Sequence, residues 1–515
     1  MASLSFIIFC PLAAALVIAL LPAGLRVLFR LLAIAATFLA LVGATRVFLG
    51  FEAGGAEFQF VEQADWIRAL GAGYHLGVDG LNVGLLLMAA MVGFAAACVS
   101  WEIEHREKEY YILLMLITGG VLGTFVALDL LLFYVFHELA LIPTFLMIGI
   151  WGRGAEREYA TFKITLYLTI GAMLVLLGLT GIYAGGGFRT LDMVELQQRV
   201  LTHPVAAAWQ GPLFGLLLFG FGILVSLWPF HTWAPMGYAA APTATAMLHA
   251  GVLKKVGLYG LIRIALPLLP EGAQSWLPVL AVLCLGNIVH ASLVAMRQRD
   301  LNLLAGNSSV AHVGFAFLGI ASLTVLGVTG AVMVMVAHGF LAALVFGLNG
   351  FLYQRLGSLQ MDRLGGLLTA MPFAGTVLIA AMLAGCGLPG FAGFAGEVMV
   401  LFGAWEYSRW LAALAAWGAL ILAAVYMLRA IRLVFHGPVP DKLRALTDIG
   451  NPWRALPYGL LLAALIGFGI WPRAITDKAE PAVRRILVNS GNATSPSAVA
   501  VAGVTTVTAD GRTAD

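Results

Sequence analysis

The sequence predicts an all-α polytopic membrane protein with about 14 transmembrane helices, arranged as two inverted five-helix repeats that contain broken helices. Of its 515 residues, 61% are hydrophobic and 11% are charged, whereas a soluble globular protein carries about 25% charged residues. The mean hydropathy is +0.95, and the apolar segments continue for about 20 residues, the length of a membrane-spanning helix. They do not alternate as the strands of a membrane β-barrel do.

The apolar runs divide the chain into five parts. Residues 1–110 are expected to hold spans 1–3 and an outside loop, residues 111–266 the first repeat (spans 4–8), and residues 267–435 the second repeat (spans 9–13). Residues 436–487 are expected to hold one C-terminal helix, span 14, and residues 488–515 a disordered polar tail. The expected spans are 3–22, 28–50, 79–100, 111–128, 130–151, 161–184, 212–230, 240–266, 276–296, 303–325, 327–354, 370–404, 408–435 and 455–472.

Basic residues set the predicted orientation. Arg26 follows the first apolar run, so that run is expected to be a retained span rather than a signal peptide, with its N-terminus outside. With this start, most basic residues fall in inside loops, as the positive-inside rule requires, and both termini lie outside. Two outside loops are long: residues 51–78 are expected to form a short hairpin or cap, and residues 188–205 a surface helix. The basic residues expected inside are Arg26, Arg30, Arg106, Lys108, Arg153, Arg157, Arg297, Arg299, Arg355, Arg363, Arg432, Lys442, Arg444 and Arg454.

Composition also excludes several classes of function. A net charge of +3 argues against a nucleic-acid partner. The four cysteines have no C-x-x-C spacing, which argues against a disulfide framework or an iron–sulfur site on this chain. No G-x-G-x-x-G motif follows a strand, and no G-x-x-x-x-G-K-[ST] motif occurs, so no nucleotide chemistry is expected.

Charged residues interrupt several of the predicted spans. Glu138 in span 5 and Glu397 in span 12 lie in apolar surroundings, and Lys254 and Lys255 stand together in span 8. Charges at this depth are costly and usually functional. Lys163, near the start of span 6, has an equally good structural explanation, because a lysine near the interface can extend its ammonium to the headgroups.

Histidines recur in the same spans. A neutral imidazole can pass a proton near physiological pH, although any one buried histidine is more often a hydrogen-bonded core residue. Five of them, together with the buried glutamates and lysines, indicate a proton relay. They are His231, His249, His290, His312 and His338.

Helix-breaking residues lie at matching places in the two repeats. Pro229 and Pro235 interrupt span 7, and Pro389 with Gly385 and Gly387 interrupts span 12. Each is the fourth span of its repeat if the repeats are spans 4–8 and 9–13, or the third if they are spans 5–9 and 10–14. An odd number of spans per repeat inverts the second repeat. Broken helices at corresponding positions of inverted repeats are typical of transporters.

Several longer motifs resemble one family. The chain resembles the antiporter-like, proton-translocating subunits of respiratory complex I, most closely the type called chain M in bacterial NADH:quinone oxidoreductase. The matching stretches are HLGVDGLNVGLLLM (75–88), FHELALIPTFLMIGIWG (136–152), HTWAPMGYAAAPTATAMLHAGVLKKVGLYGLIRI (231–264), RQRDLNLLAGNSSVAHVGF (297–315), VAHGFLAALVFGLNGFLYQR (336–355) and GLPGFAGFAGE (387–397).

The resemblance implies a role for each matching residue. Glu138 corresponds to the membrane glutamate that modulates a neighbouring lysine, Lys255 to the central lysine, His312 and His338 to the connecting histidines, and Glu397 to the terminal group. It also implies no flavin, iron–sulfur cluster or NADH site on this chain, and therefore no cofactor and no redox chemistry of its own. We include Lys163, Lys254 and His249 with these five residues as candidates for the relay.

Three residues depart from the family pattern. Leu224 occupies the place of the usual span 7 lysine that partners Glu138, Met236 that of a charged residue after W-x-P, and Asn302 that of a basic residue. A leucine cannot carry a proton, so the first half-channel is either rerouted or inactive. Because a buried carboxylate needs a cation, one hypothesis is that Lys254, the extra lysine, pairs with Glu138 instead. The alternative is that Lys254 faces water or lipid headgroups and has no role.

Three functions remain open from the sequence. The first is a translocase subunit that moves protons in the membrane arm of a complex I-like enzyme in the bacterial inner membrane, beside other membrane-arm subunits and lipid. The second is the equivalent subunit of a membrane-bound hydrogenase, a cation/proton antiporter or an inorganic-carbon uptake complex. The third is a non-conducting structural subunit.

Overall fold

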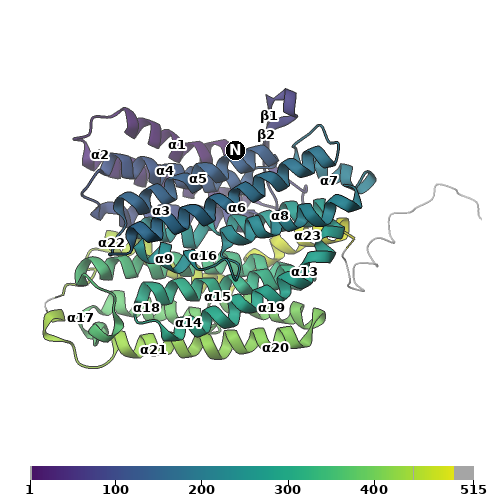
Figure 1. The fold of residues 1–515 in the computed structure, drawn as a ribbon. Coiled ribbons are helices and arrows are strands. Elements are labelled where there is room, and N and C mark those ends of the chain that lie inside the picture. The colour runs from purple at the N-terminus through teal and green to yellow at the C-terminus, as the bar shows by residue number, and fades with distance from the viewer. Residues whose placement is uncertain (1–2, 445, 492–515) are drawn as a thin grey trace, which may run out of the picture.

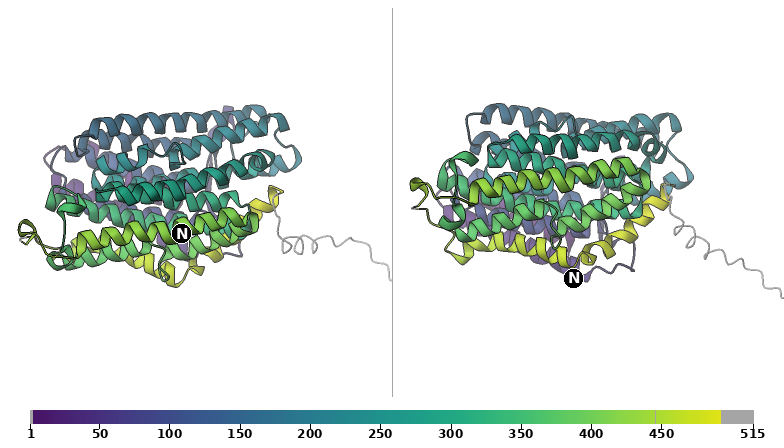
Figure 2. Two further views of the ribbon diagram at one scale, coloured as in Figure 1. Left: turned by 60° about the horizontal axis from the view of Figure 1, so that its bottom comes forward. Right: turned by 90° about the horizontal axis from the view of Figure 1, so that it is seen from below.

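The computed structural model describes residues 3–444 and 446–491, which form a bundle of long helices lying side by side (Figures 1 and 2). Within these residues, ten helices are long and apolar enough to cross a membrane, and three shorter apolar helices lie among them. Because lipid offers no partner for a free amide or carbonyl, an apolar chain must satisfy its backbone within helices. The prediction of an all-α polytopic membrane protein is confirmed.

The hairpin expected in loop 51–78 is present and joins the second span to the third. Its first strand pairs antiparallel with its second, and Glu62 on the first strand accepts hydrogen bonds from Ser3 Oγ at 2.8 Å and the Leu4 amide at 2.6 Å. The start of the chain is thereby attached to the hairpin. The elements are α1 (Leu4–Leu20), α2 (Arg26–Gly50), β1 (Gln59–Ile67), β2 (Ala72–Val78) and α3 (Val83–Val99).

The first repeat contains the predicted break in span 7. Its first half, α8, ends at Val225, where Ser226 adopts a left-handed conformation with φ of 77°, and its second half, α9, begins at Trp233. The expected surface helix within 188–205 is also present, as α7. The elements are α4 (Glu107–Val126), α5 (Leu130–Trp151), α6 (Arg157–Gly185), α7 (Met193–Thr202), α8 (Ala207–Val225), α9 (Trp233–Ala240), α10 (Thr243–Leu248), α11 (Lys255–Gly260) and α12 (Leu266–Leu268), with π-helical segments at His249–Leu253 and Leu261–Ala265.

The second repeat is broken at the equivalent place. In span 12, α18 ends at Gly385 and α19 begins at Ala392, and between them Gly387 and Gly390 have φ of 71° and 99°. Only glycine adopts such values without strain. The elements are α13 (Pro270–Leu285), α14 (Ala291–Arg297), α15 (Leu301–Ala321), α16 (Val325–Leu356), α17 (Leu367–Ala370), α18 (Pro372–Gly385), α19 (Ala392–Tyr407), α20 (Arg409–Trp417) and α21 (Ala423–Phe435), with π-helical segments at Gly286–His290 and Gly418–Leu422.

The C-terminal region differs from its prediction. Residues 436–487 were expected to hold one helix, but the structure has two, α22 (Pro452–Ile470) and α23 (Arg473–Asn489). The second is amphipathic, and its apolar face, which includes Ile475 and Val483, is buried. Because α23 continues to Asn489, the start of the predicted tail is helical, while its remainder, 492–515, lies outside the described residues.

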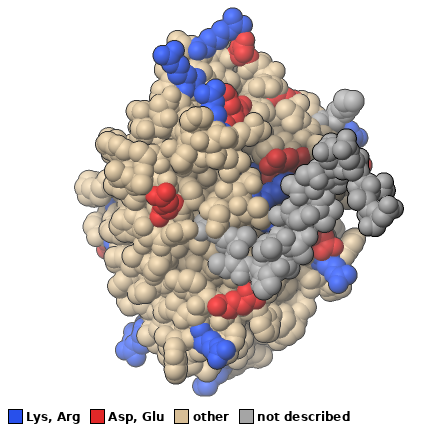
Figure 3. All heavy atoms as spheres, turned by 90° about the vertical axis from the view of Figure 1, so that its right-hand side faces the viewer, with Lys and Arg blue, Asp and Glu red and all other residues tan. Residues whose placement is uncertain are grey.

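The hairpin, α7 and α23 gather at one end of the bundle, on the right in Figure 1. His75 Nδ1 lies 2.5 Å from Asp192 Oδ2, and Lys478 donates to the Phe51 carbonyl at 2.8 Å. Burial alone would raise the pKa of Asp192, but hydrogen bonds from His75 and from backbone amides of α7 outweigh it and lower that pKa. Seen end-on in Figure 3, this face carries scattered charges on a mostly uncharged surface. Both ends of the described chain therefore lie on one face.

One buried ion pair joins this face to span 8. Arg263 Nη2 lies 2.5 Å from Asp79 Oδ1, and both side chains are almost completely buried. Asp79 also accepts hydrogen bonds from the Leu81 and Asn82 amides. Neither charge has another charged partner within 4 Å in the described chain, so each depends on the other.

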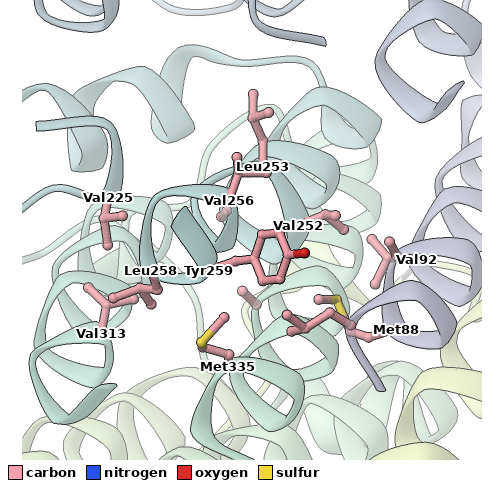
Figure 4. Packing of buried hydrophobic residues seen from close by; sticks show 14 of the residues in the cluster. Met88, Val92, Val225, Val252, Leu253, Val256, Leu258, Tyr259, Val313 and Met335 are labelled. Carbon is pink, nitrogen blue, oxygen red and sulfur yellow. The ribbon is translucent and has the colours of Figure 1, made fainter. Parts of the chain in front are cut away.

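Span 8 runs through the centre of the core. Figure 4 shows Val252, Val256 and Tyr259 of this span packed against Met88 and neighbouring apolar side chains. Helices α3, α8, α15 and α16 all contribute to this shell. The charged residues of span 8 are therefore held in an apolar surrounding that excludes bulk water.

We expect both termini to lie outside the cytoplasm. The structure places both ends of the described chain on one face, and basic residues are concentrated in the loops of the opposite face. A reporter that is active only in the cytoplasm, fused after Asp515, should remain silent, whereas the same reporter inserted after Gly154 should be active. An active C-terminal fusion would contradict this orientation.

We expect Asp79→Asn to destabilise the protein by about 3–5 kcal/mol, because it leaves the Arg263 guanidinium buried without its charged partner. The loss should appear as a lower melting temperature of the purified protein in detergent. Asp65→Asn is the matched control, since Asp65 forms an exposed pair with Arg68, and exposed pairs contribute little. Equal melting temperatures for the two variants would be inconsistent with this assignment.

Candidate functional site

The site begins at an irregularity in span 8. In the π-helical segment His249–Leu253, the Lys254 amide donates to the His249 carbonyl at 3.2 Å, five residues back instead of four. The Ala250 carbonyl, which an α-helix would pair with Lys254, accepts the Lys255 ammonium at 2.5 Å. π-helical turns of this kind are frequent at functional sites. Here the turn supplies an acceptor for a buried charge.

Lys255 also reaches the neighbouring helix α16. Its Nζ lies 2.7 Å from Nδ1 of His338. An ammonium group can only donate, so Nδ1 accepts and the neutral imidazole carries its proton on Nε2. The ring of His338 is 5.7 Å from the ring of His312 on α15, measured between centroids.

His312 lies between two backbone carbonyls and a carboxylate. Its Nδ1 is 2.7 Å from the Ser308 carbonyl, and its Nε2 is 3.2 Å from the Gly385 carbonyl. Carbonyl oxygens only accept, so both contacts are hydrogen bonds only when both ring nitrogens carry protons. Glu397 Oε1 lies 3.8 Å from Nε2. The ring nitrogens of His312 thus have two backbone acceptors and one carboxylate within 4 Å.

Two small cavities border this row of side chains. One, of about 10 Å³, is bounded by His312, His338 and Glu397. The other, of about 20 Å³, is bounded by Ser308, Ser309 and the same two histidines. A cavity of about 10–15 Å³ can hold one water molecule. Lys255, His338, His312 and Glu397 therefore form a continuous buried series of titratable groups with room for water beside it.

Lys254 points to a different helix. Its Nζ donates to Ser309 Oγ at 3.0 Å and approaches the Ser309 carbonyl at 3.3 Å, both on α15. The ammonium also lies 5.6 Å from the ring centroid of Tyr238 on α9. The two lysines are sequence neighbours, but their ammonium groups bind different elements.

Glu138 lies apart from both lysines. Its titratable neighbours include Tyr134 and His137, and Nδ1 of His137 is 3.6 Å from Oε1; the Glu138 side chain is 25% exposed at the surface of the described chain. Within that chain, no ion pair joins Glu138 to a lysine. The hypothesis that Lys254 pairs with Glu138 is therefore wrong. The physical reason is direction: after the π-helical turn, Lys254 is directed to α15, whereas Glu138 is on the outer side of α5.

The other candidates also lie outside the series. The Lys163 ammonium is 3.7 Å from Met236 Sδ and stands over the Tyr159 ring. His249 is buried and stacks on Trp233 with 5.3 Å between centroids, and neither of its ring nitrogens has a hydrogen-bond partner in the described residues. Among described residues, then, Lys163 and His249 form no hydrogen bond or ion pair with Lys255, His338, His312 or Glu397.

A larger cavity of about 670 Å³ lies between the loops of the face opposite the hairpin and the interior. Two of the departures from the family pattern, Met236 and Asn302, line it. His231 and His290 also line it, with 5.6 Å between their ring centroids. We call this cavity the inner vestibule. It reaches α9 and α15, the helices that contact the Lys254 ammonium.

Sequence reasoning did not identify several residues of the site. Ser308 and Ser309 lie about one helical turn before His312, in GNSSVAH, so this spacing could have indicated a shared face. Tyr238 and the Gly385 carbonyl gave no such signal, because only the packing of separate spans brings them to the lysines and histidines.

Comparisons with known proteins agree with this geometry. Residues 127–423 match the family described as NADH:quinone oxidoreductase/Mrp antiporter, transmembrane. The chain is 35% identical over 500 residues to NADH-quinone oxidoreductase subunit M of Rhodobacter capsulatus, which covers 94% of this chain and 96% of the relative. It is 36% identical over 480 residues to NAD(P)H-quinone oxidoreductase chain 4 1 of Picosynechococcus sp. This alignment covers 90% of this chain and 88% of the relative.

A solved structure of a complex I chain is similar over nearly the whole length of this chain. One chain of respiratory complex I from Thermus thermophilus with bound NADH superposes with a TM-score of 0.86 and 29% sequence identity. The superposition covers 95% of this chain and 100% of that chain. The similarity thus extends over the whole bundle.

We expect Leu224→Lys not to restore any activity that Lys254→Met removes. Leu224 is buried on α8, against Gly171 of α6, whereas the Lys254 ammonium is bound on α15. An ammonium introduced at position 224 therefore cannot replace that contact. Proton translocation by the assembled complex is the measurement, with Leu224→Met as the control. Recovery in the Leu224→Lys, Lys254→Met double variant would show that the two positions are interchangeable.

Proposed function

The chain belongs to the NADH:quinone oxidoreductase/Mrp antiporter transmembrane family, and from this premise we propose that it translocates protons in the membrane arm of a complex I-like NADH:quinone oxidoreductase. The observation that carries the proposal is the buried series Lys255–His338–His312–Glu397, with contacts of 2.7 Å at its start and 3.8 Å at its end. Full-length similarity to subunit M of Rhodobacter capsulatus supports the choice of parent complex.

The chemistry of the relay follows from its donors and acceptors. The Lys255 ammonium gives a proton to Nδ1 of His338, and His338 then releases its Nε2 proton toward His312. His312 becomes an imidazolium held by the Ser308 and Gly385 carbonyls, and it passes a proton to Glu397. Each step moves one proton between neighbouring side chains or through one water, and no electron is transferred on this chain.

The wider setting is part of the proposal. Quinone reduction elsewhere in the complex would supply the free energy, so the chain would act in a translocase without redox chemistry or a cofactor of its own. Its partners would be other membrane-arm subunits and the lipid of a bacterial inner membrane. Glu138, at the surface of the bundle, would face such a neighbour instead of the internal series.

We expect Glu397→Gln to lower the rate of proton translocation through this subunit by about 100-fold, because a positioned acid–base group contributes at least that much to the transfer that it serves. A glutamine has the same shape but cannot accept the proton from His312. The measurement is proton uptake by proteoliposomes that contain the assembled complex, followed with a pH-sensitive dye during NADH oxidation.

Glu406→Gln provides the matched control, because Glu406 is an exposed carboxylate near the end of the same helix α19. It should translocate protons at the wild-type rate. Unchanged protons per electron in an assembled Glu397→Gln complex would remove Glu397 from the relay and with it the proposed series.

A further inference from the structure

Lys254 is a buried ammonium that the series above does not use. It is 1% exposed, and its contacts are with Ser309 on α15 and the Tyr238 ring on α9. The side chain of Lys255, in contrast, is bound by Ala250 in its own span and by His338 on α16. Keeping a second ammonium beside the first is unfavourable, because like charges repel strongly where the dielectric constant is low. A side chain retained against this cost requires a specific explanation.

Ser309 links Lys254 to the histidine pair. Its hydroxyl accepts a hydrogen bond from the Lys254 ammonium at 3.0 Å. Ser309 also borders the 20 Å³ cavity that His312 and His338 border. The cavity has room for one water molecule and polar groups to bind it. A water there would lie between the Ser309 hydroxyl and the two imidazole rings.

The same two helices lead from Lys254 to the inner vestibule. Asn307 of α15 and Met236 of α9 line that cavity, and each lies two residues from a residue that contacts the Lys254 ammonium, Ser309 and Tyr238 respectively. Two residues correspond to about 3 Å of helix rise and about 200° of rotation, so the members of each pair lie at a similar depth on different sides of their helix. His231, which lines the inner vestibule, interacts electrostatically with Lys254. Lys254 is therefore within electrostatic range of the inner vestibule and, through Ser309, adjoins the cavity of the histidine pair.

The hydroxyl of Tyr238 and the ring nitrogens of His249 add buried polar atoms to the surroundings of Lys254. The Tyr238 hydroxyl is fully buried and has no hydrogen-bond partner in the described residues, and the same is true of both ring nitrogens of His249, whose ring packs on Tyr238 at 5.4 Å between centroids. Buried polar atoms in proteins almost always have a protein or water partner. The neighbourhood of Lys254 thus provides several binding atoms for water.

We propose that Lys254 is a second proton donor to the His312–His338 pair, acting through the Ser309 hydroxyl and one water in the adjoining cavity, in parallel with direct donation by Lys255. This inference rests on the proposed function. An N–H bond of Lys254 breaks as Ser309 Oγ gains a proton, the hydroxyl proton passes to the water, and a water proton passes to an imidazole nitrogen. Lys254 is left as a neutral amine, which regains a proton from the inner vestibule. No oxidant or reductant takes part.

The arrangement gives proton uptake a path that avoids Leu224. Protons would reach the histidine pair from the inner vestibule along α9 and α15, without passing the Glu138 side of the bundle. Because the two ammonium groups repel each other, loading Lys254 would also favour release of the Lys255 proton to His338. The additional lysine, Lys254, would then compensate for the lysine that Leu224 replaces.

The test uses the assembled complex in proteoliposomes and compares Lys254→Met, Ser309→Ala and the double variant. We expect each single variant to lower protons translocated per electron from this subunit by about twofold or more, because one of two positioned donors is lost. The double variant should be no worse than the more impaired single variant, since both residues serve one path. Ser322→Ala is the control, because Ser322 is a buried serine just beyond the end of α15, and it should translocate as the wild type does.

Lys254→Arg separates proton donation from a structural role. Arginine keeps the positive charge and can donate to Ser309, but it does not release its proton at physiological pH. We expect it to be as impaired as Lys254→Met, whereas full activity of Lys254→Arg would show that a fixed charge suffices and would overturn the proposal. If the complex with Lys254→Met does not assemble, Ser309→Ala still tests the path, because it removes only the hydroxyl that receives the proton from Lys254.

Comparison with Lys255→Met distinguishes a failure of the parallel path from a failure of the proposed function. If Lys255→Met and Glu397→Gln lose translocation while Lys254→Met and Ser309→Ala do not, the parallel path is refuted and the proposed function stands. If none of the four variants changes translocation, the proposed function itself fails.

Discussion

The two adjacent ammonium groups of span 8 impose the constraint on which the site depends. An uncompensated charge in a low-dielectric interior costs several kcal/mol, and two neighbours on one helix point only about 100° apart. The π-helical segment His249–Leu253 immediately precedes both residues, and it leaves the Ala250 carbonyl available to Lys255. Lys254 is bound separately by Ser309. Each charge thus has its own polar contacts, and the surrounding apolar helices can pack without leaving either lysine isolated.

The second irregularity, the break in span 12, serves the other end of the series. Where α18 ends at Gly385, its last carbonyls lack intrahelical partners, and the Gly385 carbonyl lies 3.2 Å from His312 Nε2. Glu397 lies on α19, just after the same break. Lys255 and His312 are therefore both held by backbone carbonyls that irregular helix geometry makes available. The π-helical segment before Lys254 and the break in span 12 thus each supply an acceptor to the series.

Each repeat contains a broken span, α8–α9 in the first and α18–α19 in the second, but the polar groups are unevenly distributed between the repeats. The first repeat has Leu224 buried against Gly171, and Glu138 lies at the surface beside His137. The continuous series of titratable groups crosses from span 8 into the second repeat. The inner vestibule is lined by Asn302 and Asn307 of α15, and Glu138 is not among its lining residues. The symmetry of the fold consequently does not extend to the chemistry, because side-chain identity at a few positions decides which half is polar.

The sequence alone determined the helical membrane fold, the two breaks and the identity of the buried charges. Each of these depends on local properties: runs of apolar residues, proline and glycine positions, and charges within apolar runs. Tertiary structure decided the rest. The direction of Lys254 depends on a π-helical turn for which the apolar pattern gives no signal, and the partners of His312 come from α18 and α19, far away in the sequence. The amphipathic helix α23 was hidden for a related reason, since its low hydropathy gives no span signal and its burial requires a surface that only the folded bundle provides.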